Sequence, residues 1–118
     1  MTKTAKNVNL GDKLFYTKDG QVNPTITDRM WYEEKEITVR SLELSDDGRD
    51  IIINKGRPDV RTFGFNESVF TERAQVMAIV NDLNAREKKK ELDRREMLYK
   101  QLEECEEIIT FFDKLSEM

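Results

Sequence analysis

Every strong breaker of regular backbone structure lies in the first 64 of the 118 residues. All five glycines and both prolines fall there, and residues 65–118 contain neither residue type. Glycine and proline interrupt helices and mark turns, so nothing in the second half of the chain would stop a long helix. The first half carries the turn residues that a set of short strands needs.

Residue composition changes at the same place. Strand-favouring Val, Ile, Thr and aromatic residues dominate 12–65, and helix-favouring Glu, Lys, Arg, Leu and Met dominate 71–118. The sequence therefore predicts an α+β fold, a small bent antiparallel sheet followed by a long C-terminal helix or helices. We expect a flexible N-terminus over 1–9, the β module over 10–66 and a helical oligomerisation region over 67–118.

Turn residues divide the β module into four or five short strands, which could curl into a half-open barrel of SH3-like size. An alternating apolar pattern over 37–44 changes parity at Arg40-Ser41, which predicts a bulge or bend there. Turn residues at 45–48 join this strand to 51–53 in a hairpin, and a last strand lies within 60–65.

Two apolar stripes at helical spacing follow. Val76, Val80 and Leu83 form the first, which we expect to pack on the sheet. The segment 84–97 is mostly charged, and a kink or break near Asn84 or within this segment is left open. Beyond it, apolar residues recur at alternating intervals of four and three, the spacing of a coiled-coil seam. The seam predicts a homo-oligomer through Leu98, Leu102, Cys105, Ile109 and Phe112, with an intrachain helical hairpin as the alternative.

The sequence lacks the residues and motifs that most enzymes use for catalysis. The chain has no histidine, which removes the side chain most used in acid–base catalysis and nucleophile activation, and it has no phosphate-loop or dinucleotide fingerprint. Three aspartates, Asp46, Asp47 and Asp50, are interpreted as turn residues because they lack the spacing of a calcium loop. We therefore predict a protein that is not an enzyme and that uses no cofactor and no metal.

The single cysteine bears on the cellular location, and the net charge of -4 bears on the kind of partner. One thiol cannot form an internal disulfide, and the chain lacks an apolar leader or membrane span, so we expect a cytoplasmic protein, in the host cytoplasm if it is viral. The net negative charge disfavours long nucleic acid as a partner, and acidic residues interleave with the basic run of 86–95.

One group of residues is typical of a phosphate-binding site. Guanidinium groups on a glycine-containing turn, near aromatic rings able to stack a base, could bind a nucleotide or another phosphate-bearing small ligand. An exposed turn with ordinary surface arginines is the alternative. The candidate ligand-binding residues are Arg29, Trp31, Tyr32, Lys55, Arg57, Arg61 and Phe63.

The layout of a bent β module that ends in ESVFTERA (67–74) and runs into a long charged helix resembles small accessory proteins of bacteriophages. Among these, it resembles the Thoeris anti-defence sponge family. The resemblance implies a β-sheet with C-terminal helices, oligomerisation, and sequestration of a cyclic or ADP-ribose-type signalling nucleotide. It covers the whole chain in layout, and no ligand-binding residue of that family is carried over.

We therefore predict a non-enzymatic accessory protein that oligomerises and sequesters such a nucleotide to antagonise host defence. The alternatives are an inhibitor that docks a host protein, for which Trp31 and Tyr32 beside the Pro24 loop offer an apolar patch, and a small oligomeric structural or nucleic-acid-associated module.

Overall fold

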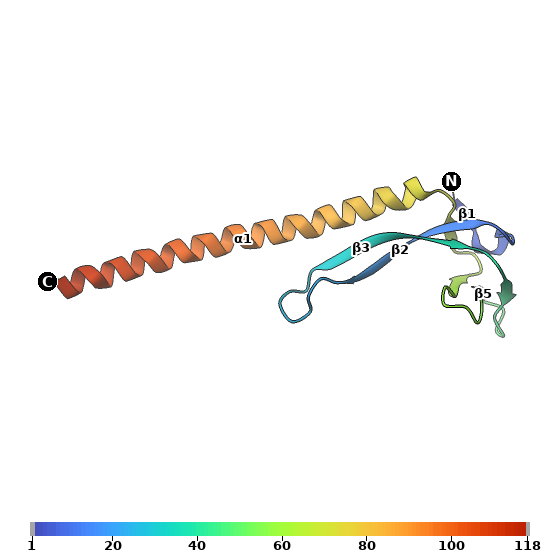
Figure 1. The fold of residues 1–118 in the computed structure, drawn as a ribbon, viewed down its shortest axis with the longest axis horizontal. Helices are drawn as coiled ribbons and strands as arrows, with labels where there is room; N and C mark the ends of the chain where they lie inside the picture. The colour runs from blue at the N-terminus through green and yellow to red at the C-terminus, as the bar shows by residue number, and fades with distance from the viewer. Residues whose placement is uncertain (1, 118) are drawn as a thin grey trace. The chain divides into compact units, whose positions relative to one another are not determined.

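The computed structural model describes residues 2–117 and confirms the α+β fold, antiparallel strands followed by one long helix (Figure 1). The chain divides into two compact units, residues 1–84 and 85–118. The elements are β1 (Thr2–Thr4), the 3-10 helix η1 (Ala5–Asn7), β2 (Lys13–Gln21), β3 (Met30–Thr38), β4 (Leu42–Leu44), β5 (Asp50–Ile53), β6 (Arg61–Gly64), β7 (Ser68–Phe70) and α1 (Arg73–Glu117).

The strands form two sheets rather than the predicted four or five strands of one half-open barrel. One sheet has the order β1-β7-β2-β3 and the other the order β4-β5-β6. The sequence predicted a flexible segment over 1–9, but Thr2–Thr4 pairs with Ser68–Phe70, and Ala5 and Val8 are buried. Each of these two strands is only three residues long, too short for a visible alternation. They are defined by pairing with distant strands, β1 with β7, and β7 also with β2 through Phe15 opposite Phe70.

The longest pairing in the β unit is the β2–β3 hairpin, in which nine residues of each strand are in register from Lys13 opposite Thr38 to Gln21 opposite Met30. In Figure 1 this hairpin reaches well beyond the sheet that contains β5. After β3 the chain leaves the sheet at 39–41 and enters β4, which confirms the bend predicted from the change of parity. The predicted hairpin that follows is also present, as β4 paired with β5.

The hydrophobic core lies at the base of the long hairpin and joins the two sheets. Leu14 and Ile37 face each other across β2 and β3, and they pack with Ile53 and Phe63 of the second sheet. Asn54 is completely buried beside them. The other core members are Ala5, Val8, Val39 and Val69.

The helix α1 runs without interruption from Arg73 to Glu117. The break considered near Asn84 or within the charged segment therefore does not occur, and neither does the alternative of an intrachain helical hairpin. The first three turns of α1 bury Val76 and Val80 of the first apolar stripe, whereas Leu83, the third member, is half-buried. On the same stripe, Arg73 pairs with Glu34 and Asn84 bonds to Tyr32, both on β3. No helix within residues 2–117 is long and apolar enough to cross a membrane.

Candidate phosphate-binding site

The turn between β5 and β6 carries two of the candidate residues, Lys55 and Arg57, and it is organised by Asn54. Asn54 has a left-handed backbone with φ 57°, a conformation that Asn tolerates better than most residues. Its Oδ1 accepts hydrogen bonds from the N–H groups of Arg40 at 2.7 Å and Ser41 at 3.3 Å. Its Nδ2 donates to the Thr38 carbonyl at 2.9 Å. One buried amide therefore ties the turn to the bend between the two sheets.

Gly56 and Arg57 continue this turn. Gly56 has φ 81°, which suits glycine, and the Arg57 N–H donates to the Asn54 carbonyl at 3.0 Å. The Arg57 side chain is exposed and makes no ion pair with any residue of 2–117 that the structure describes. Lys55 is engaged instead, because its Nζ lies 3.4 Å from Glu43 Oε1.

Arg61 is the best-defined candidate. Its guanidinium carbon lies 3.8 Å from the centroid of the Tyr16 ring and 5.6 Å from that of Phe63. Its Nε is buried and has no hydrogen-bond partner among the described residues. Stacking on an aromatic ring holds the guanidinium in one orientation. A guanidinium that is already oriented loses less conformational entropy when it binds a phosphate or carboxylate. The structure thus brings Arg61 and Phe63 together and adds Tyr16 to them.

The candidates on β3 lie elsewhere. Trp31 and Tyr32 are consecutive residues of one strand, so their side chains point to opposite faces of the sheet. Trp31 is opposite Gly20, near the hairpin tip, whereas Tyr16 is opposite Lys35. Four residues of strand separate these two levels, about 13 Å at the usual rise.

Arg29 precedes β3 and pairs with Asp28, with 2.8 Å between Nη2 and Oδ1. The structure therefore does not gather the seven candidates into one site. Lys55, Arg57, Arg61 and Phe63 belong to the second sheet and its turn, while Arg29, Trp31 and Tyr32 belong to the hairpin.

Sequence reasoning missed two residues of this region, Tyr16 and Asn54. Tyr16 could have been found from alternation along β2, because it lies two residues after the core residue Leu14 and therefore shares its face. The Asn-Lys-Gly order of 54–56 marks a turn, but the burial of the Asn54 amide depends on the distant bend at 39–41.

The acidic turn after β4 holds no metal-type cluster. Asp47 Oδ1 accepts from the Ser45 hydroxyl at 2.7 Å and from the Arg49 N–H at 3.1 Å. The hydrogen bond from the Ser45 hydroxyl contributes most, and that from the Arg49 N–H contributes next, to holding the pKa of Asp47 below its ordinary value. Among the described residues, no three His, Cys, Asp or Glu side chains gather as metal ligands. The interpretation of Asp47 as a turn residue is confirmed.

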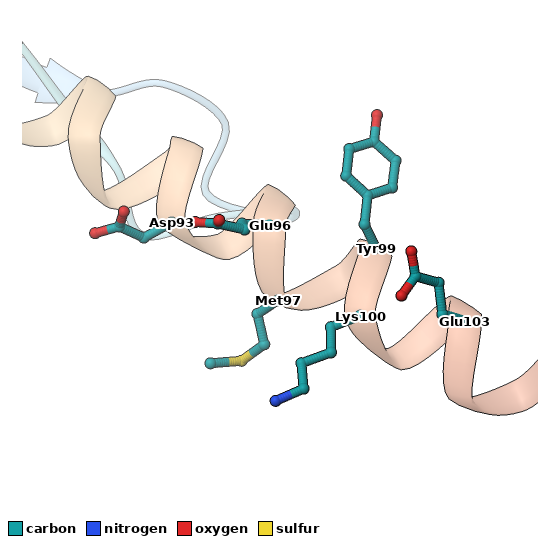
Figure 2. Close-up of a pocket in the computed structure, with 6 residues that line it drawn as sticks. All are labelled: Asp93, Glu96, Met97, Tyr99, Lys100 and Glu103. Carbon is teal, nitrogen blue, oxygen red and sulfur yellow. The ribbon is translucent and has the colours of Figure 1, made fainter.

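In the unit from residue 85 onward, the predicted oligomerisation seam is open to solvent. Leu98 is 51% exposed, Leu102 57% and Phe112 60%. Cys105 is a free, exposed thiol. This helix also carries a shallow hollow whose lining side chains all belong to one helix, so the hollow has no second wall. Figure 2 shows these side chains projecting from successive turns. The hollow is lined by Asp93, Glu96, Met97, Tyr99, Lys100 and Glu103.

Comparisons with protein-family models, with curated proteins and with solved structures found no significant match to this chain.

Proposed function

We propose that this protein is a self-associating, non-enzymatic binding protein that sequesters a small phosphate-bearing ligand. The observation that carries the proposal is the Arg61 guanidinium held 3.8 Å over the Tyr16 ring. A guanidinium stacked on a ring keeps its N–H fork in one plane, which suits paired hydrogen bonds to phosphate oxygens. The resemblance to anti-defence sponges favours a cyclic or ADP-ribose-type nucleotide as the ligand.

Arg57 supplies the second cation in the proposal. Its side chain is exposed on the turn that leads into β6, four residues before Arg61. Two guanidinium groups would supply two positive charges for the phosphate charges of a diphosphate, and each charge-assisted hydrogen bond is stronger than a neutral one.

Calorimetric titration of the full chain with ADP-ribose and with cyclic ADP-ribose tests the proposal. We expect binding that Arg61→Ala abolishes and that Arg57→Ala weakens about tenfold, which corresponds to one charge-assisted hydrogen bond. Arg49→Ala is the matched control, because Arg49 is exposed at the opposite end of β5. Equal binding by Arg61→Ala and the parent chain would reject the site.

Docking of a host protein is the second candidate function, and the tip of the β2–β3 hairpin favours it. Val22 is 59% exposed and Ile26 is 67% exposed in the loop that contains Pro24. Exposed apolar side chains at a loop tip are typical contact residues. Docking would be favoured if the chain binds neither nucleotide but does bind a defined protein partner. That binding should be lost in Ile26→Asp and kept in Arg61→Ala.

A further inference from the structure

The helical unit from residue 85 onward exposes apolar side chains that a chain in water would bury. Every residue from 92 to 117 is exposed, and some of the apolar ones, from Leu98 to Phe112, recur at the four-and-three spacing of a coiled-coil seam. Five of them form the seam itself, and Ile108 and Leu115 widen it. A continuous apolar stripe of this length is a surface that another helix covers.

Charge is distributed unevenly along the same helix. Residues 86–100 carry seven Lys or Arg and four Asp or Glu, whereas residues 101–117 carry six Asp or Glu and only Lys114 as a base. Two copies aligned in parallel would place the basic halves together and the acidic halves together. Two antiparallel copies would place each basic half beside an acidic half, which the sign of the charges favours.

We propose that the seam binds the same seam of a second copy in antiparallel orientation, with a two-fold axis between residues 103 and 104. In this register Leu102 faces Cys105 of the second copy, and Leu98 faces its Ile109. Arg94 then lies at the level of Asp113, and Lys90 at the level of Glu117. A two-fold axis makes each facing pair of seam residues occur twice, so one chain is complementary to itself.

The inference rests on the self-association in the proposed function, and it adds the relative orientation and the register of the two helices. The two arrangements differ most at Leu98. In a parallel pair, Leu98 faces its own counterpart. In the antiparallel pair, the two Leu98 residues are eleven residues apart along the axis, about 16 Å at the helical rise, too far for a disulfide.

Disulfide trapping in the full chain tests the orientation. In a Cys105→Ser background, Leu98→Cys and Ile109→Cys are prepared singly, and each is oxidised alone and after mixing with the other. We expect cross-linked dimer only in the mixture. Cross-linking of Leu98→Cys alone would overturn the antiparallel orientation, and sedimentation equilibrium of each reduced variant shows whether it still self-associates.

Sedimentation of the parent chain separates failure of this inference from failure of self-association. We expect a mass of two chains, reduced to one chain by Leu102→Asp and unchanged by Thr110→Asp, which lies on the helix outside the seam. A single-chain mass for the parent protein would overturn self-association itself. A two-chain mass with self-linking Leu98→Cys would overturn only the antiparallel register.

Discussion

The side-chain amide of Asn84 on α1 bonds to both backbone groups of Tyr32 on β3. Asn84 Nδ2 donates to the Tyr32 carbonyl at 2.9 Å, and the Tyr32 N–H donates to Asn84 Oδ1 at 3.0 Å. Because β3 is an edge strand of its sheet, these two backbone groups would otherwise be left without a strand partner. The amide therefore takes the place of a neighbouring strand at this position.

Replacing Asn84 tests how strongly this contact holds α1 on the sheet. We expect Asn84→Ala to lower the free energy of unfolding by about 2 kcal/mol, because two partly buried backbone groups lose their partner. Asn81→Ala is the control, since Asn81 lies one turn earlier and is exposed. Urea unfolding measures both. Equal stability of the two variants would show that water bonds to the backbone N–H and carbonyl of Tyr32 as well as the Asn84 amide does.

Asn54 is expected to be the polar residue on which the fold depends most. Asn54→Ala removes three hydrogen bonds to 38–41 and places a residue of poor left-handed propensity at φ 57°. We expect a loss of about 3 kcal/mol or more in the free energy of unfolding. Asn54→Gly keeps the backbone conformation and should lose less. If both variants lose the same amount, the backbone conformation contributes nothing.

Gly20 provides space for the only tryptophan. A Cβ at Gly20 would clash with the Trp31 indole ring. Gly20→Ala should therefore displace the ring and shift the Trp31 fluorescence emission to longer wavelength. Gly64→Ala is the matched strand control, because its nearest new contact is 3.6 Å and ordinary. An unchanged spectrum in Gly20→Ala would mean that the indole does not lie over Gly20.

Stability should fall in acid partly through Asp12. The Asn9 N–H, and next the Lys3 side chain, bond to the Asp12 carboxylate at 2.9 Å each and hold its pKa below the ordinary 3.8. A carboxylate with a lowered folded pKa stabilises the fold above its unfolded pKa, and this contribution disappears as pH falls through the folded value.

The midpoint of thermal unfolding should therefore differ between the parent chain and Asp12→Asn at pH 7, and the difference should shrink below about pH 4. Asp46→Asn is the control, because Asp46 is an exposed residue of the acidic turn. A difference that stays constant from pH 7 to pH 2 would show that the Asp12 charge does not contribute.

Local sequence patterns determined the fold class, because they depend on neighbouring residues alone. The absence of Gly and Pro after Gly64 predicted a long helix, and α1 runs unbroken over Arg73–Glu117. The change of parity at Arg40-Ser41 predicted the bend between β3 and β4. The stripe through Val76 and Val80 predicted the buried face of the first helical turns.

Tertiary structure alone decided which distant residues meet. Thr2–Thr4 pairs with Ser68–Phe70 across more than 60 residues of chain, and Phe70 also pairs with Phe15 of β2. Arg61 reaches the Tyr16 ring only because the second sheet packs on the base of the long hairpin.

Strand geometry separated residues that the sequence places side by side. Trp31 and Tyr32 are adjacent in the chain, yet the alternation of β3 sends them to opposite faces. The spacing of apolar residues predicts which face of its own strand or helix a residue occupies. Contacts between strands and helices depend instead on many interactions between residues that are distant in the sequence, and a local pattern does not specify these interactions.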